Sequence, residues 1–355
     1  MQCTDARTDP RAWTAALTRL DPGGAIFGEG SLRVILTLIL AVLVCAPARA
    51  NDSTAALATG GLVFVRNPDI EMRSEHLFIS AAEIRVRYRF FNNATHDVTT
   101  LVAFPMPEIQ GDETLDSGNV AIPRDDPQNI LGFSTLADGH PVITRVEQTV
   151  RANSIDRTDL LRGLGIPLAP HLESSTEALN RLPALAREQL LKLGLIEIDE
   201  SLTPQPVRPR WALQTTHYWE QTFPAGREFV IEHHYKPSVG TSQWPEAVTA
   251  ETRTRYCIDQ DLLRTLERAQ RASPRDFAPF SLQHIEYILK TGANWAGPIG
   301  DFRLVVDKGD ARNLVSFCGD GVKKIGPTQF EMRESDFIPN RNLHVLILER
   351  NQMHR

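Results

Sequence analysis

The sequence predicts a mainly β protein, α+β by content: an antiparallel β-sandwich with a helical insertion and a C-terminal β-rich half that carries one helix. Three observations lead to this fold class. Several short segments alternate between apolar and polar residues, and Gly, Pro, Asp and Asn separate them. Helical spacing of apolar residues is concentrated in two stretches of the chain. Repeated short alternating segments with such punctuation are typical of sandwiches and barrels.

The clearest predicted strand is residues 83–91, in which four apolar side chains alternate with Glu and Arg. This period of two places one set on a buried face and the other on a solvated face. The next strand, 98–104, should end at Pro105, because proline cannot extend a hydrogen-bonded ladder. Further strands are expected at residues 142–150, 229–235, 285–289, 302–306, 314–318 and 343–348.

Two regions are predicted to be helical. The first is an insertion at about 155–197, where Ser174 and Glu177 fit a capping box, Pro183 starts a second short helix and Gly194 ends it. The second is residues 259–271, with leucines on one face and Asp259 as the expected N-cap.

The N-terminal region has the pattern of a secretory signal. Arg33 precedes an unbroken apolar run from Val34 to Cys45, and the small residues Ala48-x-Ala50 follow. This three-part order predicts cleavage after Ala50. The apolar run is too short to cross a bilayer as a helix. We interpret residues 1–50 as a signal peptide whose translation starts nearer Leu32, and we expect a periplasmic or secreted protein with no membrane span after cleavage.

We divide the remaining chain into an N-terminal sandwich part, 51–240, and a C-terminal β-rich part, 241–355. Only Cys257 and Cys318 remain after cleavage. Two cysteines in an exported chain favour a disulfide, and two buried free thiols are the alternative.

The formal net charge of −6 argues against nucleic-acid binding, which needs a basic face. The sequence contains none of the common catalytic or cofactor motifs, so we assign no catalytic residue, no metal and no cofactor. His233 and His234 are neighbours on a predicted strand and point to opposite faces, so they cannot bind one ion together. One of them could pair with His217 if their strands are adjacent.

Two groups of residues are candidate ligand or partner contacts. The first is His217, Trp219 and Glu220, in an aromatic-rich segment after the insertion. The second is Asn294 and Trp295, in a loop of small residues that would allow a ligand to approach closely. The alternative for the tryptophans is packing in the core, which is the usual role of large aromatic side chains.

The chain resembles a bacterial exported family catalogued as domain of unknown function 4424. The resemblance rests on NDSTAALATGGLVF (51–64), YRFFNN (88–93), YWEQTFPAG (218–226), HHYKPSVG (233–240) and TGANWAGPIGDFRLVV (291–306). It spans nearly the whole predicted mature chain. It implies an exported, largely β protein and supplies no activity.

These observations lead to two functional expectations. The first is a non-enzymatic exported binding or protein-interaction module, whose helical insertion contacts another envelope protein. The alternative is an envelope-associated hydrolase with a site near Trp219 and Glu220 or near Asn294 and Trp295. A buried carboxylate within hydrogen-bond reach of a histidine would favour the hydrolase, and a dry loop filled by aromatic packing would favour the binding module.

Overall fold

The structure is a computed structural model that describes residues 53–58, 61–111, 120–198, 206–243, 248–274 and 277–352. The predicted signal peptide lies outside the described residues. Residues 48–355 form one compact unit by their internal contacts. Its described part contains three larger antiparallel sheets and one two-stranded sheet, with a single parallel strand pair, which confirms the mainly β fold class.

The first sheet, sheet A, has seven strands. Its order is β11 (Ile155–Asp156), β10 (Arg145–Ala152), β14 (Ala212–Phe223), β5 (Val98–Pro105), β1 (Ser53–Ala58) and β2 (Gly61–Val65), with β6 (Ile109–Gln110) also pairing with β14. The predicted strand 98–104 is confirmed as β5. The strand predicted at 142–150 begins later, at Arg145, because Val142 pairs with Thr135 in a separate hairpin of sheet B.

The second sheet, sheet B, has eight strands. Its order is β20 (Lys323–Lys324), β21 (Gln329–Phe337), β18 (Ile299–Asp307), β3 (Ile70–Ile79), β4 (Ile84–Asn92), β15 (Glu228–Tyr235), β8 (Ser134–Ala137) and β9 (His140–Val142). Its one parallel pair joins β18 to β3. The two parts that we divided near residue 240 therefore contribute strands to one sheet.

Strand β4 illustrates how the side chains of sheet B alternate between the buried and the exposed face. Its apolar residues Val86, Tyr88 and Phe90 are buried, and the alternating arginines Arg85 and Arg87 are exposed. This is the alternation that the sequence predicts for a strand with one face in the core.

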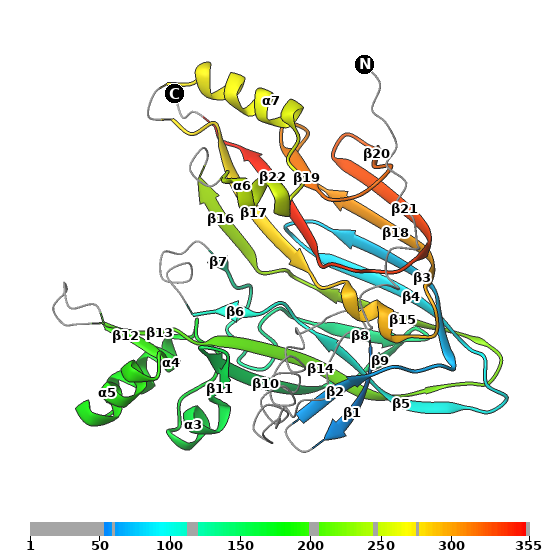
Figure 1. The fold of residues 1–355 in the computed structure, drawn as a ribbon, viewed down its shortest axis with the longest axis horizontal. Helices are drawn as coiled ribbons and strands as arrows, with labels where there is room; N and C mark the ends of the chain where they lie inside the picture. Colours follow the sequence, from blue (N-terminus) through cyan, green and yellow to red (C-terminus); the bar gives the residue numbers. More distant parts are fainter. Residues whose placement is uncertain are drawn as a thin grey trace, which may run out of the picture. The chain divides into compact units, whose positions relative to one another are not determined.

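The third sheet, sheet C, is covered on one face by helices. Its order is β19 (Leu314–Phe317), β22 (Leu343–Arg350), β17 (Phe280–Tyr287), β16 (Val239–Gln243) and β7 (Val120–Ala121). Leu282, Leu346 and Leu348 pack on that face in a cluster with Leu266 of helix α7 (Gln260–Arg271). Figure 1 shows α7 and the short helix α6 (Ala250–Arg255) beside these strands. The predicted cap of α7 is confirmed, because the Asp259 carboxylate accepts a 2.7 Å bond from the backbone N–H of Leu262.

The helical insertion comprises α3 (Thr158–Gly163), α4 (Glu173–Arg181) and α5 (Ala184–Lys192). Within the insertion, α4 and α5 lie beside the two-stranded sheet of β12 (Ile196–Ile198) and β13 (Val207–Pro209) (Figure 1). Pro183 precedes α5 and Gly194 follows it with φ +70°, as predicted.

The predicted capping box of the insertion is wrong. Helix α4 begins at Glu173, and its N-cap, Leu172, makes no side-chain cap bond. Ser175 is instead fully buried, and its hydroxyl donates a 2.7 Å hydrogen bond to the carbonyl of Ala169. The hydroxyl satisfies a buried loop carbonyl, which would otherwise be costly to leave unpaired.

The inner faces of sheets A and B enclose an aromatic core. Phe104 of sheet A lies 4.8 Å from the ring of His233 in sheet B, and Phe223 lies 5.6 Å from Phe90. A register shift between Met72 and Ser74 in β3 turns Glu75 inward. Glu75 is completely buried, and its carboxylate accepts a hydrogen bond from the hydroxyl of Tyr287 in sheet C.

A disulfide joins Cys257, just after α6, to Cys318, just after β19, as predicted. Cys257 has φ 53°, which turns the chain sharply at the end of the helix. The bridge fixes the C-terminal end of α6 against the edge of sheet C.

Candidate functional site

The strongest candidate site lies at the C-terminal end of α6 and comprises two neighbouring cavities. The larger has a volume of about 840 Å³ and the smaller about 220 Å³. Arg255 and His344 line both cavities and therefore mark the boundary between them. We call this site the α6 pocket, and its two parts the large chamber and the small chamber.

Strand register brings the polar residues of the small chamber together. Glu286 of β17 is directly opposite His344 of β22, and His284 is opposite Gly240 of β16. Residues 284 and 286 share one face of β17 because side chains alternate along a strand. That face lies on the helix-covered side of sheet C, next to Tyr256.

Tyr256 and Ser242 hold the His284 imidazole by both nitrogens. The Tyr256 hydroxyl lies 2.9 Å from Nδ1, and the Ser242 hydroxyl lies 2.5 Å from Nε2. Burial, and secondarily the positive charge of Arg255, lowers the pKa of His284 to about 4. The ring is therefore neutral at pH 7 and can donate through one nitrogen and accept through the other.

Charged side chains of both signs surround His344 at the boundary between the chambers. The pKa of His344 is lowered chiefly by burial, and the charges of Arg255 and Arg341 lower it further, against the opposing effect of Glu286. Of these two guanidinium groups, that of Arg255 pairs with Glu251 over 2.7 Å, whereas Arg341 has no ion pair with a described residue. An unpaired cation next to a cavity attracts an anionic group.

The large chamber opens between sheet B and sheet C and has an apolar floor. Phe302 and Leu304 of β18, Met332 of β21 and Leu343 of β22 are all buried and line it. The other lining residues include the cations Lys290 and Arg341 and the carboxylates Asp320 and Glu334. A pocket of several hundred Å³ that combines apolar side chains with convergent polar groups is typical of small-molecule sites.

Another cavity, of about 680 Å³, lies on the outer face of sheet B. Its basic residues are already paired: Arg87 lies 3.1 Å from Glu232, and Arg303 lies 2.7 Å from Glu331. Because these charges are neutralised within the protein, this face offers less to a charged ligand than the α6 pocket does.

His217 and Trp219 lie together in the aromatic core, apart from the α6 pocket. The His217 ring stacks on Phe133 with centroids 4.5 Å apart, and its Nδ1 lies 3.2 Å from the Thr144 hydroxyl. Burial, and next the neighbouring His233, lowers the pKa of His217 to about 4. The strands of His217 and His233 belong to different sheets, and both rings pack on Phe133 in the core between them.

Glu220 is exposed and lies on the face of β14 opposite to Trp219. The Trp219 indole is buried and donates to the Gln221 side chain over 3.3 Å. Neighbouring strand residues alternate in direction. The structure therefore does not bring Glu220 to the side of β14 on which His217 and Trp219 lie.

Asn294 and Trp295 lie at the end of the 3₁₀ helix η2 (Lys290–Asn294). The Asn294 amide donates a 2.8 Å bond to the Ser53 hydroxyl. Trp295 is completely buried, with its ring 4.6 Å from Phe90 and 5.9 Å from Phe223. The loop is filled by its own tryptophan.

Sequence reasoning missed the residues of the α6 pocket, including Arg255, His284, Glu286 and His344. One signal was available: residues 284 and 286 are polar positions on the face of β17 that also carries Leu282. A polar pair on an otherwise apolar strand face indicates a hydrogen-bonded network or a site.

Two further searches of the described part of the chain gave negative results. No group of three or more His, Cys, Asp or Glu side chains there is arranged to hold a metal ion. None of the helices in these same ranges has the length and apolar character needed to span a bilayer.

The fold and the pocket together define a class of protein: a β-sandwich with a ligand-sized pocket beside a helix-covered third sheet. Within this class, the chain belongs to the family described as Domain of unknown function (DUF4424), whose model matches residues 50–346. This confirms the resemblance found in the sequence.

Other comparisons add little. No curated protein matches the chain. A solved structure from Legionella pneumophila subsp. pneumophila str. Philadelphia 1, a protein named only as a candidate nutrient-binding protein, is similar at 15% identity and a TM-score of 0.41. The match covers 84% of this chain and 70% of that one. A likeness at this level carries no argument about function.

Proposed function

We propose that this protein is an exported binding protein that holds an amphiphilic organic anion in the α6 pocket. The observation that carries the proposal is that two cations without an ion pair line a chamber with an apolar floor, which the carboxylates Asp320 and Glu334 also line. Neither Lys290 nor Arg341 forms an ion pair or a side-chain hydrogen bond with any described residue, and both line the large chamber. Most other basic side chains that line a cavity are paired.

The apolar floor and the cations of the large chamber suit the two ends of one amphiphilic ligand. The floor of Phe302, Leu304 and Met332 would bury an apolar chain, which stabilises the complex by about 25 cal/mol per Å² of apolar surface removed from water. The cations Lys290 and Arg341 would meet the anionic end. A guanidinium group such as that of Arg341 is suited to carboxylates and phosphates, which it can bind with two parallel hydrogen bonds.

Export is the second part of the proposal. It is supported by the signal pattern before Asn51 and by the disulfide between Cys257 and Cys318, since disulfides persist in oxidising compartments. N-terminal sequencing of the protein from an envelope fraction should begin at Asn51. A chain that still begins near Leu32 would contradict cleavage.

Binding of dodecanoate by isothermal titration calorimetry tests the proposal. We expect the purified protein to bind it, and the double variant Lys290→Met/Arg341→Met to bind at least tenfold more weakly. The matched control, Lys323→Met/Lys324→Met, removes two exposed cations of β20 and should bind normally. Dodecylamine, with the same chain and the opposite charge, should bind poorly. If dodecanoate does not bind, or binds the Lys290→Met/Arg341→Met variant equally well, the proposal is wrong.

A second candidate function is contact with another envelope protein through the helical insertion. Leu185 and Leu191 of α5 are 68% and 44% exposed, and exposed leucines of this size are candidates for an interface. Deleting 155–197 would also remove core residues, including Leu179 and Leu190. The sharper test is therefore Leu185→Glu/Leu191→Glu. An envelope partner captured by the wild type and lost by this variant, while dodecanoate binding persists, would support this function.

A further inference from the structure

The cavity on the outer face of sheet B, with a volume of about 680 Å³, is chemically different from the α6 pocket. We call it the sheet B cavity. Its lining residues come from six neighbouring strands, from β21 through β18, β3, β4 and β15 to β8. Neighbouring strands lie about 4.8 Å apart, so the part from β18 to β8 alone spans roughly 19 Å. The cavity can therefore hold a ligand several rings long.

Strand register gives this cavity apolar surface on both sides. Val305 of β18 is directly beside Phe78 of β3, which in turn is beside Arg85 of β4. The Arg85 guanidinium lies over the Phe78 ring, 4.4 Å from its centroid, and such stacking is favourable. Leu136 of β8, which is 37% exposed, adds apolar surface on the other side. A ligand here must offer apolar faces of its own.

The charges of the sheet B cavity are balanced. Each arginine and histidine side chain that points into it from the outer face has a carboxylate within 3.3 Å. The pairs are Arg87–Glu232, Arg303–Glu331, Arg85–Glu83, His234–Glu83 and His76–Asp301. A charged ligand would have to displace one of these partners or leave its own charge uncompensated. The cavity therefore favours an uncharged ligand.

The same ion pairs leave hydrogen-bonding atoms available to a ligand. Arg87 donates to Glu232 through Nε, and Arg303 donates to Glu331 through Nε. The Nη groups of both arginines have no hydrogen-bond partner among the described residues. The second oxygen of the Glu232 carboxylate is an acceptor beside these donors. Donors and acceptors thus lie side by side without a net charge, which suits hydroxyl groups, since a hydroxyl both donates and accepts.

From these features we infer that the sheet B cavity binds an uncharged oligosaccharide. The C–H faces of its sugar rings would pack on Phe78, Val305 and Leu136, and its hydroxyls would bond to the free atoms of Arg87, Glu232 and Arg303. This is a second binding activity. It depends on no residue of the α6 pocket, so it stands or falls independently of dodecanoate binding.

Calorimetry with three β-1,4-linked tetrasaccharides tests the inference. Two are uncharged, the tetramers of glucose and of N-acetylglucosamine, and the third is the tetramer of glucuronate, which has the skeleton of the glucose tetramer with carboxylates added. We expect the wild type to bind at least one uncharged tetramer. The glucuronate tetramer should bind at least tenfold more weakly than the better uncharged one, because the cations of the cavity are already paired.

Two variants with matched controls locate the site. Phe78→Ala should weaken binding of the uncharged tetramer at least tenfold. Its control is Phe91→Ala, on the same face, where Arg73 lies over the ring at 3.6 Å outside the cavity. This control should bind normally.

The second variant, Arg87→Met/Glu232→Met, removes both members of an exposed pair and keeps the net charge. It should also weaken binding at least tenfold. Its control, Arg89→Met/Glu228→Met, removes a 2.6 Å pair of the same two strands that does not line the cavity, and should bind normally. Urea unfolding of all four variants confirms that they fold.

Three results would overturn the inference: no binding of either uncharged tetramer, equal binding of the glucuronate tetramer, or unchanged binding in both cavity variants. A dimer in analytical ultracentrifugation that Phe78→Ala dissociates would assign the cavity to a second copy of the chain and would also overturn it. Failure of dodecanoate to bind would remove the proposed function and leave this inference intact.

Discussion

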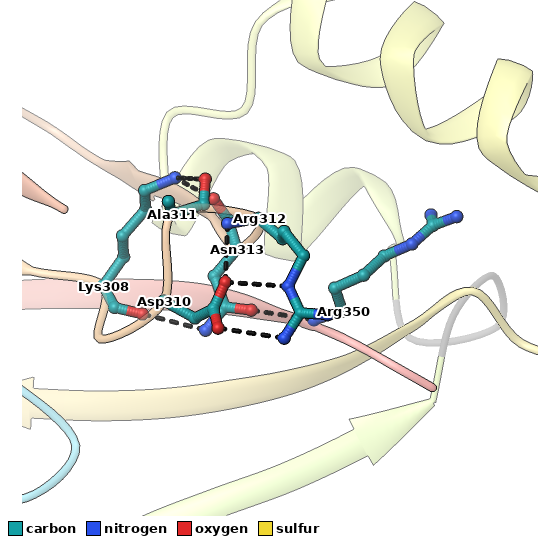
Figure 2. A network of polar contacts seen from close by, with 6 residues as sticks. All are labelled: Lys308, Asp310, Ala311, Arg312, Asn313 and Arg350. Atoms are coloured by element: carbon teal, nitrogen blue, oxygen red, sulfur yellow. Dashed lines mark hydrogen bonds and ion pairs between the residues drawn. The ribbon is translucent and has the colours of Figure 1, made fainter. Parts of the chain in front are cut away.

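Lys308 and Asn313 hold each other across the loop between β18 and β19. The Lys308 ammonium donates to the carbonyls of Ala311 and Asn313, and the Asn313 amide donates back to the Lys308 carbonyl over 2.9 Å (Figure 2). The Asn313 side-chain oxygen also accepts a 2.9 Å bond from the backbone N–H of Arg350. The loop is therefore fixed to the last strand of sheet C.

Replacing this lysine should weaken the fold. Lys308 is only 6% exposed, so Lys308→Met leaves two loop carbonyls without their donor. We expect the free energy of unfolding in urea to fall by about 1–3 kcal/mol, the usual cost of a buried unsatisfied group. The matched change Lys323→Met, at an exposed position, should cost less than about 0.5 kcal/mol. Equal effects of the two changes would contradict a structural role for Lys308.

Two buried histidines should make the protein less stable in acid. The pKa values of His217 and His284 are both lowered from 6.5 to about 4. Between pH 6.5 and pH 4, these two histidines bind protons in the unfolded chain that they do not bind in the folded chain. The free energy of unfolding should therefore fall as the pH drops from 6.5 to 4, by at most about 1.4 kcal/mol per pH unit for each histidine.

Urea unfolding at pH steps from 7 to 4.5 measures this slope. His217→Gln should make it shallower, since one of the two groups is removed. His140 is exposed, and His140→Gln should leave the slope unchanged. If the slope is the same in the His217 variant as in wild type, the burial of its imidazole does not govern acid stability.

The disulfide should contribute substantially to stability. Cys257 and Cys318 are 61 residues apart, and the chain-entropy model gives about 4 kcal/mol for a loop of this length. Cys257→Ser/Cys318→Ser should unfold at correspondingly lower urea concentration. It should also bind dodecanoate more weakly, because Arg255 lies two residues before the bridge. Reductant should shift the wild type toward the variant and leave the variant itself unchanged.

Trp295 should be a packing residue rather than a ligand contact. Its ring is completely buried against Phe90 and Phe223, so Trp295→Ala should cost about 3–5 kcal/mol. Trp295→Phe, which keeps an aromatic ring, should cost less, and Glu220→Gln at its exposed site should cost almost nothing. Normal stability of Trp295→Ala, together with lost dodecanoate binding, would show the opposite role.

The sequence is informative where a structural feature is local. The alternation in β4 is visible in nine consecutive residues, and it correctly assigns the buried Tyr88 and the exposed Arg87. The cap of α7 depends on Asp259 and the next few residues. The disulfide was predicted from the expected export of the chain, because the two cysteines after Ala50 allow only one pairing.

The α6 pocket could not be predicted because it depends on register between distant strands. Glu286 meets His344 only through the pairing of β17 with β22, and a slip of one residue would turn either side chain to the other face. The burial of Glu75 could not be predicted for a related reason. A regular strand alternates without interruption, whereas the irregularity near Ser74 shifts the residues that follow onto the other face.

The parallel pairing of β3 with β18 has a consequence for the order of folding. His76 and Asp301, whose side chains lie 3.3 Å apart across this pair, are separated by 225 residues. Contacts this far apart close large loops late and slow folding. While the chain emerges from its N-terminus, β3 lacks a neighbour on one side, and an open strand edge invites association with other chains. Strand β3 therefore gains its second neighbour only after β18, Ile299–Asp307, has been synthesised.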